Sequence, residues 1–243
     1  MSELTFVVPI LSNKLDDHAQ FCREVATKRA SDQQASRKRL GITKERGYLQ
    51  QTPQGPVFVV YVEGPRADHF LQNMGQSTEA YDKWFLQNIQ TCHGIDFAKG
   101  KPPIIQHAYT VTTTAPINTK SMAFCAPLPK EEVEDWQKFN RDVKGRSPEH
   151  IASLERAGVR KQVVCLCDTP QGPVVCVYME GIDQLSNLKM WTSDDKFDRW
   201  FVSTVNALHG IEFAKKAKEM HVDLRFDWYE GKTATQTAGR PAM

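Results

Sequence analysis

The stretch "TPQGPVFVVYVEG" (residues 52–64) returns as "TPQGPVVCVYMEG" (residues 169–181), with ten of the thirteen positions identical. In both copies "TPQG" lies between two segments that are rich in β-branched and aromatic residues. Proline and glycine supply the backbone angles that a four-residue hairpin loop needs. The stretch therefore predicts a β-hairpin that occurs twice in the chain.

The repeat extends well beyond the hairpin. The segment "YDKWFLQNIQTCHGIDFAK" (81–99) matches "FDRWFVSTVNALHGIEFAK" (197–215), and "ASRKRLGI" (35–42) matches "ASLERAGV" (152–159). The spacing between the copies changes by only one or two residues along the chain, so insertions are small. We predict two tandem copies of one domain, residues 1–116 and 117–230, followed by a disordered tail of residues 231–243.

Each copy has the same predicted order of elements. A short strand that ends at proline ("LTFVVP" or "SMAFCAP") precedes two helices, the hairpin and an amphipathic helix. A last strand, about residues 104–113 or 222–229, is expected to close its own copy. This β-α-β-β-α-β order with one additional short helix is the split βαβ pattern, so the sequence predicts two α+β domains.

Length and charge exclude several classes of protein. Of the 243 residues, 40% are hydrophobic and 25% are charged, so a buried core is expected. The net charge of +2 is too small to indicate nucleic acid as a partner. No apolar run approaches the ~18 residues of a membrane span, and the N-terminus lacks a secretory signal pattern. We expect a cytoplasmic monomer or homodimer whose partner is a small organic molecule.

The cysteines and the known catalytic motifs point to no specific chemistry. None of the six cysteines forms a CxxC pair, so the usual zinc and thioredoxin spacings are absent and reduced thiols are expected. The nucleophile-elbow, Walker, dinucleotide and HExxH signatures are absent as well. The six cysteines are Cys22, Cys92, Cys125, Cys165, Cys167 and Cys176.

The hairpin register predicts a polar sheet face in the first copy. With "TPQG" as the loop, Arg46 lies opposite Tyr61 and Lys44 opposite Glu63, and opposed residues share a face. We predict Tyr61 and Glu63 as catalytic residues, and Arg46 and Tyr48 as ligand-binding residues. Simple cross-strand ion pairs are the alternative explanation of the Lys–Glu pairs. The matching positions of the second copy hold Lys161, Val163, Cys165, Tyr178 and Glu180, and the other face of the first hairpin (Leu49, Phe58, Val60 and Val62) is predicted core.

The last strands add a histidine to this candidate site. Val222, Leu224, Phe226 and Trp228 alternate as a buried stripe, and the same phase in the first copy gives Ile105, His107, Tyr109 and Val111. His107 thus stands where an apolar residue is expected, and histidine titrates near neutral pH. We predict His107 as the catalytic acid or base and Tyr109 as ligand-binding. The alternative is a core histidine satisfied by a hydrogen bond.

The dipeptide "HG" (His93–Gly94 and His209–Gly210) ends the amphipathic helix of each copy. Glycine just past a helix end is the common stop signal, and a last-turn histidine suits the negative end of the helix. We therefore interpret both pairs as helix caps rather than as catalytic histidines. An acid three residues on from each histidine makes a two-ligand metal half-site, which predicts no metal.

The duplication and the order of elements resemble the ferredoxin-like dimeric α/β barrels, a superfamily that includes antibiotic-biosynthesis monooxygenases and small mutarotases. The resemblance covers about residues 4–229, as two fused copies. It implies an intramolecular dimeric α/β barrel, a small-molecule pocket in each copy and, as in many members, no metal or organic cofactor. It transfers no catalytic residues, because no catalytic motif of a member matches this sequence.

Three functional hypotheses follow from these observations. The first is a cofactor-independent oxygenase, cyclase or isomerase that acts on an organic metabolite at an acid/base site in the first copy. The second is a carrier that binds a small molecule without chemistry. The third is a haem protein with His93, His107 or His209 as the axial ligand.

Overall fold

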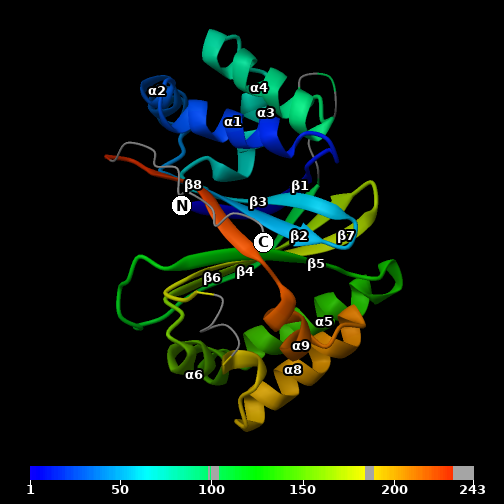
Figure 1. The fold of residues 1–243 in the computed structure, drawn as a ribbon. Coiled ribbons are helices and arrows are strands. Elements are labelled where there is room, and N and C mark those ends of the chain that lie inside the picture. Colours follow the sequence, from blue (N-terminus) through cyan, green and yellow to red (C-terminus); the bar gives the residue numbers. More distant parts are fainter. Residues whose placement is uncertain (98, 100–103, 184–188, 232–243) are drawn as a thin grey trace. The chain divides into compact units, whose positions relative to one another are not determined.

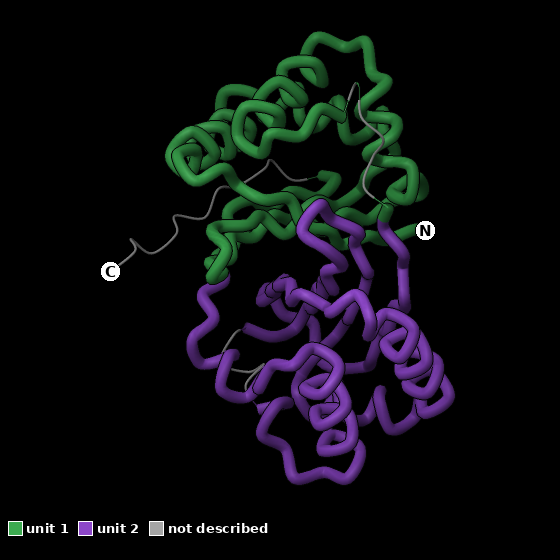
Figure 2. The backbone as a smooth tube through the Cα atoms, turned by 90° about the vertical axis from the view of Figure 1, so that its right-hand side faces the viewer, with its two compact units in different colours: residues 1–104, 223–243 green, residues 105–222 purple. Residues whose placement is uncertain are grey.

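The computed structural model describes residues 1–97, 99, 104–183 and 189–231. It consists of two compact units: unit 1 contains residues 1–104 and 223–243, and unit 2 contains residues 105–222 (Figure 2). Apart from Gly231, the predicted disordered tail lies outside the described residues. The repeat boundaries at residues 116 and 117 stay a prediction about the sequence, and the compact units follow a different division.

Unit 1 is a four-stranded sheet in the order β1-β3-β2-β8, with its helices on one face (Figure 1). The predicted opening strand, helix pair, hairpin and amphipathic helix are all present. A short additional helix precedes the amphipathic one. The elements are β1 (Ser2–Pro9), α1 (Leu15–Ala26), α2 (Ala30–Leu40), β2 (Lys44–Thr52), β3 (Gly55–Gly64), a 3-10 turn (Ala67–His69), α3 (Phe70–Gly75), α4 (Ala80–His93) and β8 (Val222–Tyr229).

Unit 2 repeats this architecture with the sheet order β4-β6-β7-β5. Its helices also lie on one face of its sheet (Figure 1). The elements are β4 (Ile105–Thr112), β5 (Ser121–Pro127), a 3-10 turn (Lys130–Glu132), α5 (Val133–Gly145), α6 (Ser147–Ala157), β6 (Lys161–Thr169), β7 (Gly172–Glu180), α8 (Lys196–His209) and α9 (Phe213–Glu219).

The repeated "TPQG" is a hairpin loop in both units. Gly55 and Gly172 have φ values of 117° and 116°, which L side chains rarely adopt. The hydroxyl of Thr52 donates to the Gly55 carbonyl at 2.7 Å, and Thr169 makes the same bond to Gly172 at 2.7 Å. The loop is therefore repeated because both hairpins need the same geometry, and the predicted register is confirmed in both.

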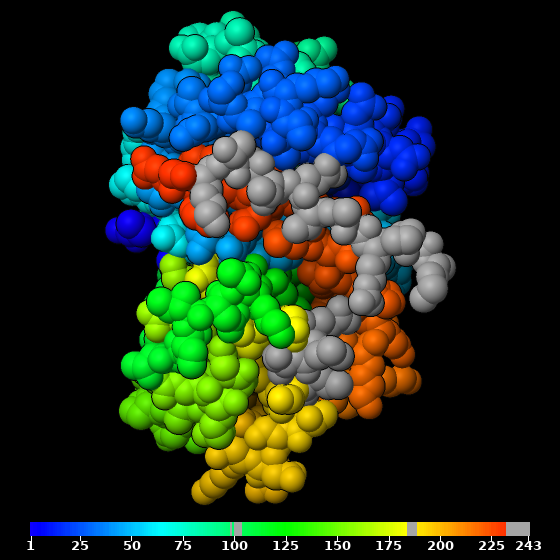
Figure 3. Space-filling model, turned by 60° about the vertical axis from the view of Figure 1, so that its left-hand side comes forward, coloured from blue at the N-terminus to red at the C-terminus, as the bar shows by residue number. Residues whose placement is uncertain are grey.

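The last strand of each copy belongs to the other unit's sheet. The sequence predicted that each copy keeps its own last strand, and this is wrong: β8 lies beside β2 in unit 1, and β4 lies beside β6 in unit 2. Arg46 of β2 donates to Asp227 of β8 at 2.7 Å. Figure 3 shows orange-red residues of β8 beside blue residues of the N-terminal part of unit 1, from which they are far apart in the sequence. The exchange covers the edges of β2 and β6, whose backbone groups need partners.

The two faces of each sheet have different surroundings. In unit 1, Phe58, Val60 and Phe226 face the helices, while Tyr48 and Tyr61 lie on the opposite face. The hydrophobic face predicted from the hairpin register is therefore the one that the helices cover. The helices and this face together form the core of the unit.

A tight contact in this core gives a first testable prediction. A Cβ atom added to Gly47 would lie 2.2 Å from Cζ of Phe58. Gly47→Val is therefore expected to lower the free energy of unfolding by about 1–3 kcal/mol through overpacking. The double variant with Phe58→Val is expected to recover most of this loss, because unit 2 has Val164 and Val175 at the matching positions. Urea unfolding of the three proteins measures the effect, and a fully stable Gly47→Val variant would contradict it.

Candidate active site

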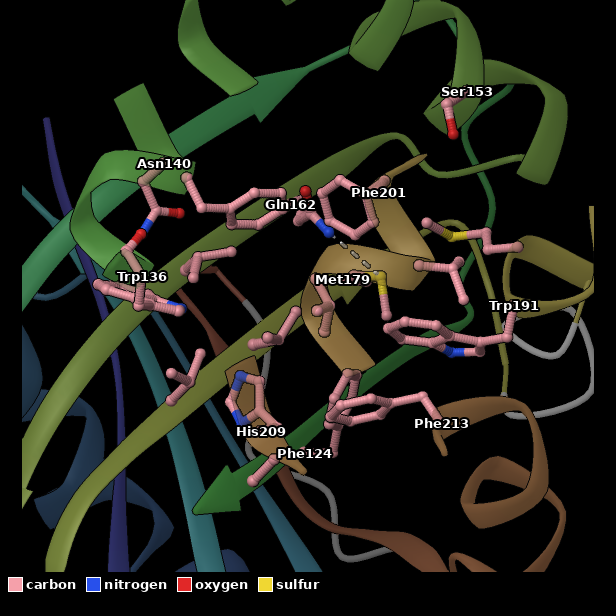
Figure 4. A pocket seen from close by; sticks show the side chains of 18 of the residues that line it. Phe124, Trp136, Asn140, Ser153, Gln162, Met179, Trp191, Phe201, His209 and Phe213 are labelled. Atoms are coloured by element: carbon pink, nitrogen blue, oxygen red, sulfur yellow. Dashed lines mark hydrogen bonds between the residues drawn. The ribbon is translucent and has the colours of Figure 1, made fainter. Parts of the chain in front are cut away.

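Each unit has a cavity between its helices and its sheet. The cavity volumes are about 70 Å³ in unit 1 and about 60 Å³ in unit 2. Both are lined mainly by aromatic and aliphatic side chains. Figure 4 shows the cavity of unit 2, with Trp136, Phe201, Trp191 and Phe213 around it. Concave apolar sites with a few polar groups are the usual form of small-molecule sites.

One histidine from the repeated "HG" lines each cavity. His93 ends α4 and His209 ends α8, and the glycine that follows each is left-handed, as the cap prediction required. The Nδ1 atom of His93 lies 2.6 Å from the Pro9 carbonyl oxygen, and that of His209 lies 2.7 Å from the Pro127 carbonyl. A carbonyl only accepts hydrogen bonds, so Nδ1 carries the proton. In the neutral ring, Nε2 then has a free electron pair.

Burial keeps both of these imidazoles neutral. It lowers the pKa of His93 to about 4, although the hydrogen bond to Pro9 acts in the opposite direction. Burial likewise lowers the pKa of His209, with the Pro127 carbonyl opposing it. At pH 7 each cavity therefore has an unprotonated imidazole in its wall, which is the protonation state of a general base.

Two amides, the Ser153 hydroxyl and the Asp198 carboxylate supply the other polar groups of the unit 2 cavity, and Asp198 is paired with Arg156 at 3.0 Å. Asn140 extends from α5 and Gln162 from β6, and Figure 4 shows Asn140 near Trp136 and Gln162 beside Phe201. The Asn140 amide donates one hydrogen to the Trp136 carbonyl at 2.8 Å, and Gln162 contacts the Met179 sulfur at 3.9 Å. Each amide nitrogen has a second hydrogen beyond the one used in that contact.

In unit 1 a charged network takes the place of these amides. Glu45 stands at the position of Gln162 and accepts from Nε of Arg37 at 2.6 Å and from Gln33 at 2.7 Å. The Gln33 oxygen in turn accepts from the Tyr81 hydroxyl. Arg37 is completely buried, and its matching residue in unit 2 is Leu154. The two cavities thus share their histidine but differ in their other polar groups.

The hairpin residues predicted as a site lie on the other face of the unit 1 sheet. The Tyr61 hydroxyl donates to Glu63 at 2.6 Å, and Tyr178 makes the same bond to Glu180 in unit 2. Arg46 pairs with Asp227, and Tyr48 is 1% exposed. Tyr61, Glu63, Arg46 and Tyr48 thus share a face in unit 1, as the register predicted, and their catalytic and binding roles stay predictions.

His107 and Tyr109 lie in unit 2 and do not share a face. The register of β4 against β6 shifts between them, so His107 pairs with Cys165 whereas Tyr109 pairs with Val164. An extra residue in one strand forms a β-bulge and reverses the alternation of side chains. The prediction from strand phase that both face the same side is therefore wrong. His107 is exposed and bonded to Thr110 at 2.9 Å, while Tyr109 lines the unit 2 cavity.

Sequence reasoning missed His209, Asn140 and Gln162 as cavity residues. The repeated "HG" was a visible signal for His209, but the sequence favoured helix capping over a catalytic role. Asn140 and Gln162 stand at ordinary positions of an amphipathic helix and a strand.

Across the described residues no cluster of three or more His, Cys, Asp or Glu side chains is arranged to hold a metal ion. No helix within them is long and apolar enough to span a membrane.

Two solved structures match this fold over nearly their whole length. A protein of Fusobacterium nucleatum subsp. nucleatum, provisionally described as a monooxygenase, matches with a TM-score of 0.51 and 9% identity over 97% of both chains. A protein of Lactobacillus acidophilus with the same description matches with a TM-score of 0.50 and 11% identity, over 98% of this chain and 100% of that one. This chain has the tandem ferredoxin-like α+β fold. The predicted fold class of two ferredoxin-like domains is confirmed, and their closure into one barrel stays a prediction.

The comparisons with sequences give no further relative. No protein-family model matches the chain, and no curated protein matches it. Identities of 9% and 11% show a common fold and leave the chemistry to be argued from the residues of this chain.

Proposed function

We propose that this protein is an oxidative enzyme that acts on a small aromatic organic molecule in the cavity of unit 2. The observation that carries the proposal is the neutral His209, whose free Nε2 belongs to an apolar cavity that also contains two uncharged amides. The two structural neighbours provisionally described as monooxygenases support the oxidative class. The sequence hypothesis placed the acid/base site in the first copy, and the uncharged amides favour unit 2.

The reaction begins with proton removal. Nε2 of His209 takes a proton from an activated methylene group of the substrate, and the carbanion adds to molecular oxygen. The resulting peroxide takes a proton and loses water, which leaves a carbonyl group at the former methylene carbon. One oxygen atom enters the product, and the other leaves as water with both hydrogens of the methylene group. The substrate supplies all four electrons that reduce the oxygen molecule, so the reaction needs no external reductant.

The amides stabilise the charge that develops during proton removal. An amide NH2 group aimed at an enolate oxygen acts in a cavity with little water, where hydrogen bonds to a charged acceptor are strong. Asn140 and Gln162 can donate their second hydrogens in this way. The matching position in unit 1 holds the Glu45 carboxylate, which has no hydrogen to donate to an enolate oxygen. This difference in hydrogen-bond donors favours unit 2 as the place of the reaction.

The size of the cavity bounds the substrate. A cavity of about 150 Å³ admits benzene, so the volume of about 60 Å³ in unit 2 is too small for an aromatic ring unless side chains move.

Trp191 lines both this cavity and an open groove on the surface of unit 2. We infer that an aromatic substrate enters when Trp191 turns outward. Trp191→Ala is then expected to raise the association rate of benzene at least tenfold, as measured by NMR exchange, and an unchanged rate would contradict this route.

Oxygen uptake tests the proposed reaction. The probes are 2-indanone, 2-tetralone and anthrone, which have activated methylene groups next to aromatic rings and increase in size. We expect uptake with at least one of them, one new carbonyl group formed per oxygen molecule, and a loss of about 10²–10⁴-fold in His209→Gln. His93→Gln is the matched control and is expected to retain uptake. Absence of uptake with all three probes contradicts the proposed reaction.

The same assay separates the competing hypotheses. If His107→Ala abolishes uptake and His209→Gln does not, the acid/base site is the one predicted from the sequence, with Tyr61 and Glu63 as its partners. If the probes bind to the protein without oxygen uptake, the protein is a carrier. A porphyrin is larger than the cavities that His93 and His209 line, so these two residues do not fit haem in this structure.

A further inference from the structure

The cavity of unit 1 contains a buried acceptor that the protein leaves unused. His93 is 2% exposed, and its Nδ1 proton goes to the Pro9 carbonyl. No hydrogen-bond donor of the described residues reaches its Nε2 atom, which is completely buried. A buried acceptor without a partner costs about 1–3 kcal/mol. A molecule that brings a donor to Nε2 recovers this free energy.

No described side chain in the wall of the cavity donates a hydrogen bond to Nε2 of His93. The nearest ring is His18, whose centroid lies 5.1 Å from that of His93 with the planes almost perpendicular. Phe58 and Phe85 form much of the remaining surface. The other polar groups of the wall contact one another: His18 lies 3.8 Å from the Cys22 sulfur, and Gln33 donates to Glu45 at 2.7 Å. A water molecule needs two to four polar partners to be stable in a cavity, and the phenylalanine rings supply none. The site therefore favours a molecule with one donor and an apolar body over water.

The charged network beside the cavity excludes ions. Both carboxylate oxygens of Glu45 accept from Arg37, at 2.6 and 3.1 Å, and one of them also accepts from Gln33. The negative charge of Glu45 and the positive charge of Arg37 thus neutralise each other. An anion or a cation entering the cavity would lose its hydration without gaining a free counter-charge, which is costly. The occupant must be uncharged.

The volume limits this occupant to a few heavy atoms. The cavity measures about 70 Å³, about half of the 150 Å³ that admits benzene. We propose that unit 1 binds a small uncharged alcohol, whose hydroxyl donates to Nε2 of His93 and whose alkyl group packs against the phenylalanine rings. This site is distinct from the unit 2 cavity and does not depend on the proposed oxidation there. The two cavities of the chain then select different ligands by their polar groups.

Comparison of an alcohol with a ketone of the same shape tests the site. The protein is labelled with 15N-histidine and titrated with 2-propanol or with acetone, which has no donor. We expect a saturable change of the His93 Nε2 resonance with 2-propanol and an affinity at least about fivefold weaker for acetone, the loss expected for one hydrogen bond. Equal affinities, or no saturation with 2-propanol, would overturn the proposal.

Two further measurements keep the result specific to His93. The His209 resonance is the internal control and is expected to stay unchanged while His93 responds. In His93→Phe, which keeps a ring but removes the acceptor, saturable binding of 2-propanol is expected to disappear. Unchanged binding by this variant would show that the alcohol sits elsewhere. If the unliganded protein already shows a hydrogen-bonded Nε2, water occupies the site and the proposal is wrong.

Discussion

Lowering the pH from 7 to 5 is expected to reduce the free energy of unfolding by about 5–6 kcal/mol through three buried histidines alone. Burial is the main cause in each case: it lowers the pKa of His18 to about 3 and the pKa values of His93 and His150 to about 4. In the unfolded chain histidine titrates near 6.5. The stability that these groups contribute is present above pH 6.5 and is lost as the pH falls toward 4, because only the unfolded state takes up protons there.

Each of these histidines accounts for about 2 kcal/mol of the loss. His150 provides the matched variant, because unit 1 has Gln33 at the same position. In His150→Gln the loss between pH 7 and pH 5, measured by urea unfolding, is expected to shrink by about 2 kcal/mol. His69→Gln is the control and is expected to leave the loss unchanged, since the His69 side chain is 62% exposed. An equal loss in the wild type and in His150→Gln would refute the explanation.

Replacing Arg37 by leucine is expected to lower the free energy of unfolding by about 3–5 kcal/mol. The guanidinium group is completely buried, donates twice to Glu45 and lies 4.6 Å from the centre of the Phe85 ring. Its removal leaves the Glu45 carboxylate, which is 6% exposed, without its counter-charge. An unpaired buried charge is more costly than the absence of the whole pair.

The second unit shows which replacement should restore stability. Unit 2 has Leu154 and Gln162 at the positions of Arg37 and Glu45. The double variant Arg37→Leu, Glu45→Gln is therefore expected to recover most of the loss of the single variant. Urea unfolding of the wild type, both single variants and the double variant gives the coupling free energy. Additive losses in the double variant would show that the ion pair is not the source of the effect.

Local patterns in the sequence predicted the elements because their causes are local. The "TPQG" loop needs only the backbone freedom of Gly55 and the fixed angle of proline, and both act within four residues. The register of each hairpin follows from its loop, so the pairs Arg46–Tyr61 and Lys44–Glu63 were predictable. The glycine stop at Gly94 follows from helix-end geometry in the same way.

The candidate sites were less predictable because they depend on distant contacts. The phase of β4 appeared continuous in the sequence, yet one extra residue placed His107 and Tyr109 on opposite faces. His209 looked like a helix cap, and it is one, but its ring also lines a cavity formed by helices and strands from several parts of unit 2. Nothing near His209 in the sequence indicates the amides of Asn140 and Gln162.

The sequence by itself determined two copies of one α+β domain, the hairpins and their register, and the hydrophobic face of each sheet. These follow from a side-chain period of two in strands and from turn chemistry. Only the tertiary structure decided which sheet each last strand joins. Both strands have a similar alternating pattern and both sheet edges offer the same backbone groups, so local sequence does not distinguish the two pairings. The cavities and their different polar groups exist only once those pairings and the helix packing are formed.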